Sequence, residues 1–135
     1  MMISSFYILL WMIFNHVIDN YFLQGILATL KQKDYWIGEC SKKGELFNKS
    51  IYKYDYIPAL FMHSFSWTFM IMLPLVIYTK FAIDPIAVLG VFAINLIIHF
   101  VTDHAKANWK VINLCTDQII HMVQIFATWL AFIVA

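Results

Sequence analysis

Apolar residues dominate four stretches of the 135-residue sequence, and polar residues dominate one segment between the first two. The apolar stretches cover residues 3–24, 57–78, 85–105 and 112–134. Each comes close to the roughly 20 residues that an α-helix needs to cross the hydrocarbon core of a membrane. The pattern therefore predicts an all-α fold, an integral membrane bundle of four transmembrane helices in a single domain, 1–135.

The polar segment, residues 31–55, is predicted to form a long loop between the first and second helices. It holds six of the nine lysines, and Lys106 and Lys110 lie in a turn on the same side of the membrane. Only Lys80 falls on the opposite side. Because loops rich in lysine remain in the cytoplasm, we expect a cytoplasmic loop and both chain termini on the extracytoplasmic side.

The composition supports the membrane class and narrows the functions. Apolar residues make up 62% of the chain, against about 45–50% in soluble domains. A net charge of +1 gives little attraction for nucleic acid, and the two cysteines, Cys40 and Cys115, indicate no disulfide framework. The sequence contains no glycine-rich nucleotide loop and no nucleophile elbow. We expect membrane lipid, a lipid-linked substrate or a second copy of the chain as partners.

Polar side chains interrupt the first two apolar stretches. His16, Asn20 and Gln24 recur at steps of four and therefore form one stripe on a helix, with Asp19 just beside it. His63 lies within the first two turns of the second stretch. Ionisable residues inside a membrane span are costly, so they mark candidate functional sites.

The third and fourth stretches carry matching polar faces. His99, Asp103 and Lys106 share one face of the third helix, whereas His104 points away from that face. The fourth helix has its own polar face, made of Asp117, His121 and Gln124 with Gln118 at its edge. With four alternating spans, all these groups fall at one level near the cytoplasmic side. We expect them to form one pocket open to the cytoplasm.

Imidazole and carboxylate groups together suit zinc and similar divalent ions. The pocket is therefore predicted to bind a divalent metal, most simply zinc, through His16, His63, His99, Asp103, Asp117 and His121. Amide and acidic neighbours would orient these ligands; the residues predicted for this role are Asp19, Asn20, Gln24, Gln118 and Gln124.

A metal with an open coordination position activates water at neutral pH. Asp103, Asp117 and Lys106 are accordingly the predicted catalytic residues, with Lys106 placed to neutralise an anionic head group or leaving group. This interpretation describes a membrane-embedded, metal-dependent hydrolase that acts on a lipid-linked or interfacial substrate.

The spacing of these residues resembles an uncharacterised family of small multi-pass membrane proteins from bacteria and their phages. That family shows His-x-x-x-Asp-x-x-x-Gln in its first span, a lone His opening its second, His-x-x-x-Asp-x-x-Lys closing its third and Asp-Gln-x-x-His in its fourth. The matching residues here are His16, Asn20, Gln24, His63, His99, Asp103, Lys106, Asp117, Gln118 and His121. Asn20 departs from the pattern at the acidic position, and Asp19 stands beside it. The resemblance implies a four-span fold with this site, in the inner membrane of a bacterium.

Two other functions fit the same residues. Chains of His and Asp within membranes also mark ion and proton pathways, although the extracytoplasmic halves, such as residues 3–11 and 127–135, carry almost no ionisable groups. A small interaction or lysis protein encoded by a phage is the second alternative, in which the polar pocket would only fix helix packing.

Overall fold

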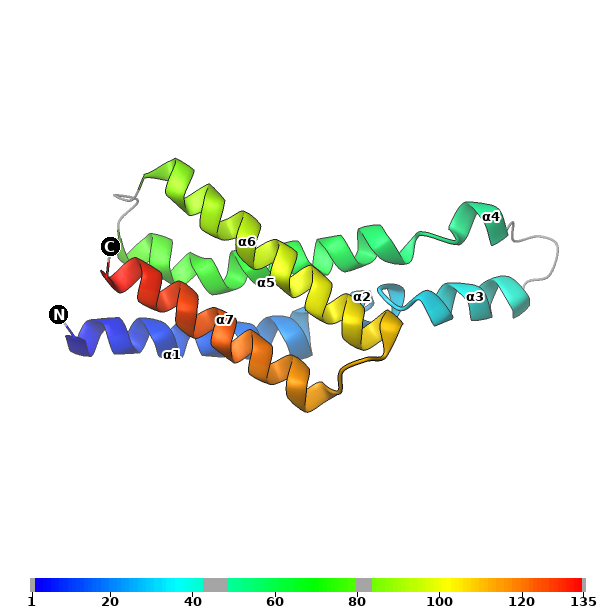
Figure 1. Ribbon diagram of the computed structural model, residues 1–135, viewed down its shortest axis with the longest axis horizontal. Coiled ribbons are helices and arrows are strands. Elements are labelled where there is room, and N and C mark those ends of the chain that lie inside the picture. The colour runs from blue at the N-terminus through cyan, green and yellow to red at the C-terminus, as the bar shows by residue number, and fades with distance from the viewer. Residues whose placement is uncertain (1, 43–48, 80–83, 135) are drawn as a thin grey trace.

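The computed structural model describes residues 2–42, 49–79 and 84–134, and every element within these ranges is helical (Figure 1). The all-α prediction is thus confirmed. In chain order the elements are α1 (Met2–Ile18), the π-helical turn η1 (Asp19–Leu23), α2 (Leu27–Leu30), α3 (Lys33–Lys42), α4 (Lys49–Tyr52), α5 (Tyr56–Tyr78), α6 (Pro85–His104), the π-helical turn η3 (Ala105–Trp109) and α7 (Leu114–Val134).

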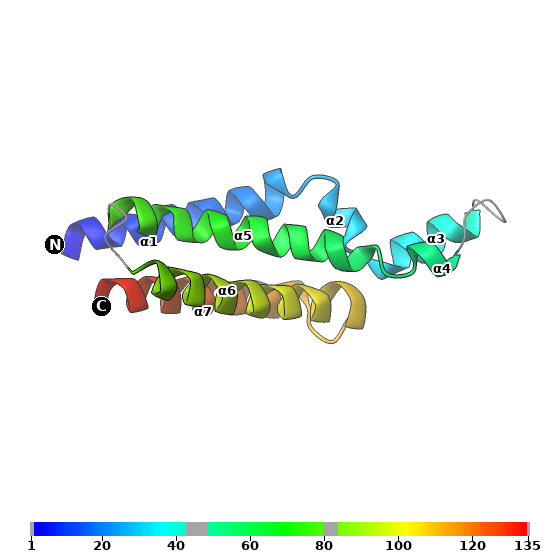
Figure 2. The same cartoon turned by 90° about the horizontal axis from the view of Figure 1, so that it is seen from above.

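The long helices α1, α5, α6 and α7 pack lengthwise in two layers, α1 with α5 and α6 with α7 (Figure 2). Both chain termini lie at one end of this bundle, and α3 and α4 extend beyond the other end (Figure 1). The end of α6 and the beginning of α7 face the α3 end, as does the π-helical turn that follows α1. Polar residues near these positions are therefore brought to one end of the bundle.

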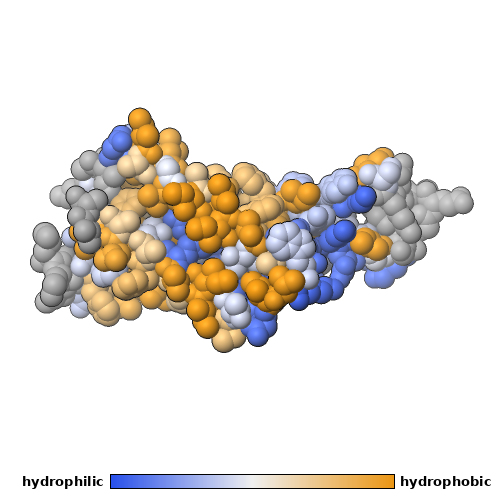
Figure 3. Space-filling model, viewed as in Figure 1, coloured by the Kyte–Doolittle hydropathy of each residue, from blue (hydrophilic) through white to orange (hydrophobic). Residues whose placement is uncertain are grey.

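Three helical segments are long and apolar enough to cross a membrane, namely Ser5–Leu23, Ser50–Tyr78 and Pro85–Trp109. Apolar side chains cover the outside of the bundle, while hydrophilic residues gather toward the α3 end (Figure 3). Phe14, Leu89 and Val123 are among the exposed apolar residues. α7 occupies most of the predicted fourth span, 112–134, as a helix, and its crossing of the membrane stays a prediction.

The start of α6 follows the local chemistry of its sequence. Asp84 caps the helix, because its carboxylate accepts a hydrogen bond of 3.2 Å from the backbone N–H of Ile86. Pro85 occupies the first turn, where its missing N–H leaves no helical hydrogen bond unmade. A second proline, Pro74, lies inside α5, which continues past it to Tyr78.

The segment 31–55, predicted as a polar loop, contains two helices, α3 and α4. The rings of Trp36 and Tyr52 stack with an angle of 1° between their planes, and this contact joins the two helices. The loop prediction was wrong for these residues because it relied on polarity and on two glycines. The intervening residues 43–48, and Lys80 from the lysine count, lie outside the described residues.

The first span ends in a turn instead of continuing straight through residues 25–30. Gly25 has a φ of +47°, a left-handed conformation that side chains rarely adopt. After this turn the short helix α2 packs against α5, which returns the chain to the end of the bundle. As a result Lys31, the first residue after α2, is buried, although the sequence placed it in the loop.

The end of the bundle near the termini has an apolar core. It consists of Ile8, Met12, Trp67, Ile71, Met72, Leu75 and Ile125 from α1, α5 and α7, all 5% exposed or less. Val88, Val91 and Phe92 of α6 pack against this group. We refer to these buried residues as the apolar core, and Trp67 forms its boundary toward the α3 end.

Candidate metal centre

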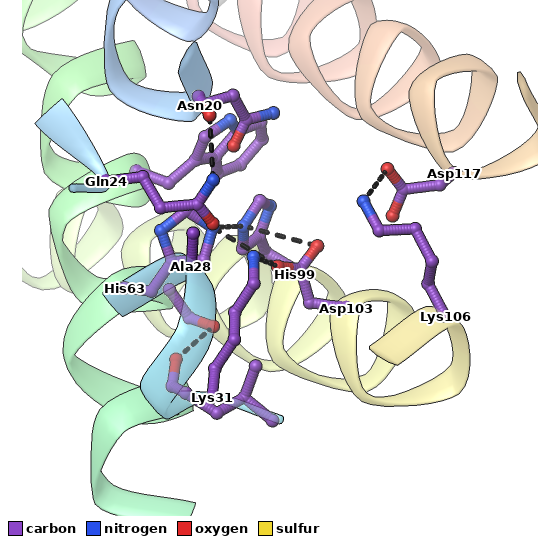
Figure 4. Close-up of polar contacts among 12 residues, drawn as sticks. Asn20, Gln24, Ala28, Lys31, His63, His99, Asp103, Lys106 and Asp117 are labelled. Carbon is purple, nitrogen blue, oxygen red and sulfur yellow. Dashed lines mark hydrogen bonds and ion pairs between the residues drawn. The ribbon is translucent and has the colours of Figure 1, made fainter. Parts of the chain in front are cut away.

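Three helices bring five buried ionisable residues together next to Trp67. His63 comes from α5, His99 and Asp103 from α6, and Asp117 and His121 from α7. None of the five is more than 1% exposed. We refer to these five residues as the His/Asp cluster, part of which is drawn in Figure 4.

Asp103 lies at the centre of the His/Asp cluster, because three imidazole rings face its carboxylate. The Nε2 atom of His63 is 3.2 Å from Asp103 Oδ2, and that of His121 is 3.3 Å from Oδ1. His99 Nε2 lies 3.8 Å from the same Oδ1 and 3.3 Å from His63 Nε2. Two ring nitrogens that face each other at this distance need a shared proton or a shared cation between them.

The second carboxylate, Asp117, lies on the α7 side. Its Oδ1 atom is 3.4 Å from His121 Nε2. Its Oδ2 atom accepts hydrogen bonds from Lys106 at 2.6 Å and from Gln118 at 2.9 Å. Asp117 and His121 are four residues apart on one helical face, so α7 offers two donor atoms side by side.

Two lysines balance the charge of the carboxylates. Lys31 Nζ is 2.6 Å from Asp103 Oδ2, and both side chains are nearly buried. Lys106 Nζ pairs with Asp117 in the same way, but its side chain is 27% exposed. Burial lowers the pKa of Lys31, and the Asp103 carboxylate opposes that shift. Lys106 is therefore the cation at the open edge of the site (Figure 4).

Asp19 reaches the His/Asp cluster from the first helix. Its Oδ1 atom accepts a hydrogen bond from Ser66, and its Oδ2 atom lies 3.9 Å from His63 Nδ1. Asp19 is buried at the start of the π-helical turn η1. Asn20 contacts His16 at 3.4 Å and no member of the cluster. Asp19, and not Asn20, thus provides the acidic group of the first span.

His16 is buried but stands apart from the groups that could hold a metal. Its Nδ1 atom accepts a hydrogen bond of 2.7 Å from the indole N–H of Trp67, and its Nε2 atom lies 3.1 Å from Gln118 Oε1. Both ring nitrogens therefore have protein partners. This geometry suits a hydrogen-bonded packing residue better than the predicted ligand.

The remaining residues predicted to orient the ligands divide into two groups. Gln118 contacts the cluster, since it donates a hydrogen bond to Asp117 and also contacts His16. Gln24 and Gln124 instead donate to the main-chain carbonyls of Asn20 and Asn95, at 2.7 Å each. His104, which the helical spacing placed off the shared face, stacks on Tyr56 outside the cluster.

Sequence reasoning missed three residues that shape the site. Lys31 was counted only as a loop lysine. Asn108 holds it in place, because its amide donates to the Lys31 carbonyl at 3.1 Å and accepts from the Lys33 N–H at 2.7 Å. Trp67 stacks on His99 with 4.1 Å between ring centroids. Gly25, as a helix breaker just before an apolar run and a lysine, was the available signal for a turn toward the bundle.

The His/Asp cluster could hold a metal ion. Two groups, His63 with His99 and Asp103, and Asp117 and His121 with the same Asp103, each place their donor atoms within 4.8 Å of one another. Ligands about 2.0–2.1 Å from a tetrahedral zinc lie about 3.3 Å apart. Four of the separations between donor atoms, at 3.2 to 3.4 Å, agree with that spacing, whereas His99 Nε2 and Asp103 Oδ1 lie 3.8 Å apart.

Fold and site together describe an all-helical protein with candidate membrane spans and a buried His/Asp cluster that could bind a metal. Comparison with family models, curated proteins and solved structures finds no match to this chain. The function must therefore be argued from the site itself.

Proposed function

We propose that this chain is a four-span integral membrane protein that binds one divalent ion, zinc, at the His/Asp cluster. The observation that carries the proposal is the convergence of five buried donor side chains from three helices, with the carboxylate of Asp103 at their centre. Buried imidazoles and carboxylates cost free energy in a membrane, so such residues mark candidate functional sites. Two histidines and one carboxylate also match the three protein ligands that catalytic zinc sites use.

The charges of the site favour one ion over two. Asp19, Asp103 and Asp117 carry three formal negative charges, and Lys31 and Lys106 carry two positive ones. One divalent ion would bring the formal sum from −1 to +1, whereas two would bring it to +3. In a buried site an uncompensated charge of that size is strongly unfavourable. Asp103, which belongs to both groups, is the natural common ligand.

The reaction that suits this centre is hydrolysis of an ester or phosphoester at the membrane interface. A bound zinc would lower the pKa of water and polarise the bond to be cleaved. The chain would supply the carboxylates of Asp103 and Asp117 around the reacting water. Lys106, the partly exposed cation, would bind the negative charge of a lipid head group or leaving group.

The same proposal gives the protein an orientation. The α3 end carries most of the lysines, so we place it in the cytoplasm with both termini on the other side of a bacterial inner membrane. We also propose membership in the family of bacterial and phage membrane proteins whose motifs the sequence resembles. The burial of Asp19 next to His63 supplies the acidic group that Asn20 lacks.

Metal content tests the proposal. Purified in detergent, incubated with zinc and freed of excess by gel filtration, the wild type should retain about one zinc per chain. His99→Ala and His121→Ala should retain little. His104→Ala is the matched control, because His104 lies outside the cluster, and it should bind zinc like the wild type. A wild type without metal, or equal loss in the His104 variant, would exclude the centre.

Hydrolysis needs its own assay. The protein in phosphatidylglycerol vesicles, loaded with zinc, should release fatty acid or a phosphate-containing head group, and mass spectrometry identifies which. Asp117→Asn should abolish release, and chelation should do the same reversibly. If zinc binds as predicted but no product forms, the catalytic part of the proposal fails while the metal centre stands.

Ion transport fits the structure less well. The residues of the apolar core between the His/Asp cluster and the termini are all uncharged, and Trp67, Met12, Ile71 and Leu75 are fully buried within it. A pathway for ions across the membrane would have to pass through this apolar core. Flux in proteoliposomes that depends on His99 would reverse the order of the two functions.

A further inference from the structure

A cavity of about 450 Å³ opens between α6 and α7, next to the His/Asp cluster. Its walls are apolar and include Val91, Ile94 and Ile98 of α6 with Ile120, Val123 and Ala127 of α7. Asn95, Gln124 and Thr128 also line it. Figure 3 faces these two helices and shows hydrophilic surface in a hollow between apolar ridges. We refer to this cavity as the α6–α7 groove.

Residues that line the α6–α7 groove lie within one helical turn of residues of the His/Asp cluster. Asn95 precedes His99 by four residues in α6, and Gln124 follows His121 by three in α7, so each pair lies on one helical face. Along α6 and the π-helical turn η3 that follows it, the order is therefore apolar groove, His99 with Asp103, and then Lys106. This order of tail site, reactive centre and cation matches the order of parts in an anionic lipid.

We propose that the α6–α7 groove binds one acyl chain of an anionic phospholipid whose head group lies at the His/Asp cluster. The inference rests on the proposed function and names the substrate class of that site. α6 is a candidate membrane span, so lipid chains surround the groove. Lys106, partly exposed beyond the cluster, and the buried Lys31 provide the positive charge that an anionic head group requires.

The size of the groove favours a flexible chain over a protein helix. Pockets for small ligands typically span about 300–1,000 Å³, and this groove lies within that range. A helix about 10 Å wide would fill its volume with roughly one turn. A second copy of this chain or a partner helix would therefore be held by very little contact.

Photolabelling tests the proposal. The wild-type protein is reconstituted in phosphatidylglycerol vesicles that contain a phosphatidylglycerol probe with a diazirine on one acyl chain. After illumination, mass spectrometry of peptides should find label concentrated at Ile98, Val123 and Ala127. Phe14 and Leu89, which are exposed on the outside of the bundle, should carry about tenfold less label, as expected for a specific over a non-specific contact.

Two substitutions of alanine by tryptophan test whether the label reports binding in the α6–α7 groove. Ala127→Trp fills the groove and should lower labelling at Ile98 and Val123 about tenfold, because an occupied cavity cannot accept the chain. Ala93→Trp is the matched control, since Ala93 is also exposed, on α6, but does not line the groove. If Ile98 and Val123 carry no more label than Phe14, or keep their label in Ala127→Trp, the groove does not bind the acyl chain.

Two further measurements distinguish a failure of the lipid site from a failure of the metal centre. A phosphatidylcholine probe should label the groove less than phosphatidylglycerol does, and equal labelling would overturn the anionic preference. Zinc content is measured on the same samples. Groove labelling without bound zinc would contradict the proposed metal centre and leave the lipid site standing, whereas bound zinc without groove labelling would do the reverse.

Discussion

The interior of the helical bundle is apolar at the end near the termini and polar at the α3 end. At the terminal end, Met12, Ile71 and Leu75 fill the interior with apolar atoms. At the α3 end, the interior contains imidazoles, carboxylates and a lysine, all nearly inaccessible. Trp67 lies between the two, because it belongs to the apolar core and its ring also stacks on His99.

The comparison shows which end is built for stability alone. An apolar interior needs only complementary shape, whereas a buried charged interior needs every group paired. Among the described residues, the Nδ1 atoms of His63, His99 and His121 and the Oδ1 atom of Asp117 have no hydrogen-bond partner. The polar end is therefore less well satisfied than packing alone requires, which is typical of functional sites.

Breaking the centre of the polar end should have the largest effect. Asp103→Ala leaves the ammonium group of Lys31 buried without its partner, so we expect a loss of about 3–5 kcal/mol in the free energy of unfolding. The double variant Asp103→Leu with Lys31→Met should recover most of that stability but bind no zinc. Denaturation in detergent and zinc content measure the two quantities. Equal stability of wild type and Asp103→Ala would contradict the buried pair.

An equivalent truncation in the apolar core should have a smaller effect on stability and none on the metal. Leu75→Ala removes a fully buried side chain and should cost about 2 kcal/mol, the lower limit for such changes. The value is low because in a membrane the unfolded helix exposes Leu75 to lipid and not to water. Zinc content should remain at the wild-type level; a loss of zinc would show that the two ends are coupled.

Much of the polar end follows from helical periodicity. The faces that carry His99 with Asp103, and Asp117 with His121, meet in the structure because each pair is spaced by four residues on an amphipathic helix. His63, which the sequence places in the first two turns of the second span, lies in the first turns of α5 and belongs to the His/Asp cluster. The role of these residues as ligands stays a prediction, but their convergence was readable from spacing and depth alone.

Other parts of the site depend on contacts that periodicity does not encode. Lys31 reaches Asp103 only because Gly25 adopts a positive φ and α2 turns back over α5. His16 has the spacing of a ligand, but Trp67 and Gln118 occupy its nitrogens. The choice between Asp19 and Asn20 depends on Ser66 and His63 across the interface with α5. The position of Lys31 and the contacts of His16 and Asp19 therefore depend on tertiary partners that helical spacing does not reveal.

The Asp19 contact offers a finer test of the polar end. Asp19→Asn removes the negative charge that faces His63 Nδ1, and we expect zinc affinity to fall about 10–100-fold, as for other residues that orient metal ligands. Asn20→Ala is the control and should leave affinity unchanged. Competition with a zinc chelator of known affinity measures both. A larger loss in the Asn20 variant would reverse the assignment.

The smallest effect is expected at the surface pair Lys110 and Asp34, which lies outside both ends. The hydrogen bond from Lys110 lowers the pKa of the Asp34 carboxyl. Its stabilising contribution is therefore present above the unfolded pKa, about 3.9, and is lost as pH falls through the lowered folded value. Wild type should melt slightly above Asp34→Asn at pH 7 and equally with it in strong acid. A difference that grows in acid would contradict this sign.

X-ray absorption at the zinc edge tests the central claim most directly, because it reports which atoms surround the metal. In the zinc-loaded wild type we predict nitrogen and oxygen ligands at about 2.0–2.1 Å with the outer-shell scattering of imidazole. His99→Ala should weaken that imidazole signal. Sulfur ligands at about 2.3 Å, as from the exposed thiol of Cys115, or a shell of water alone, would contradict a metal centre at the His/Asp cluster.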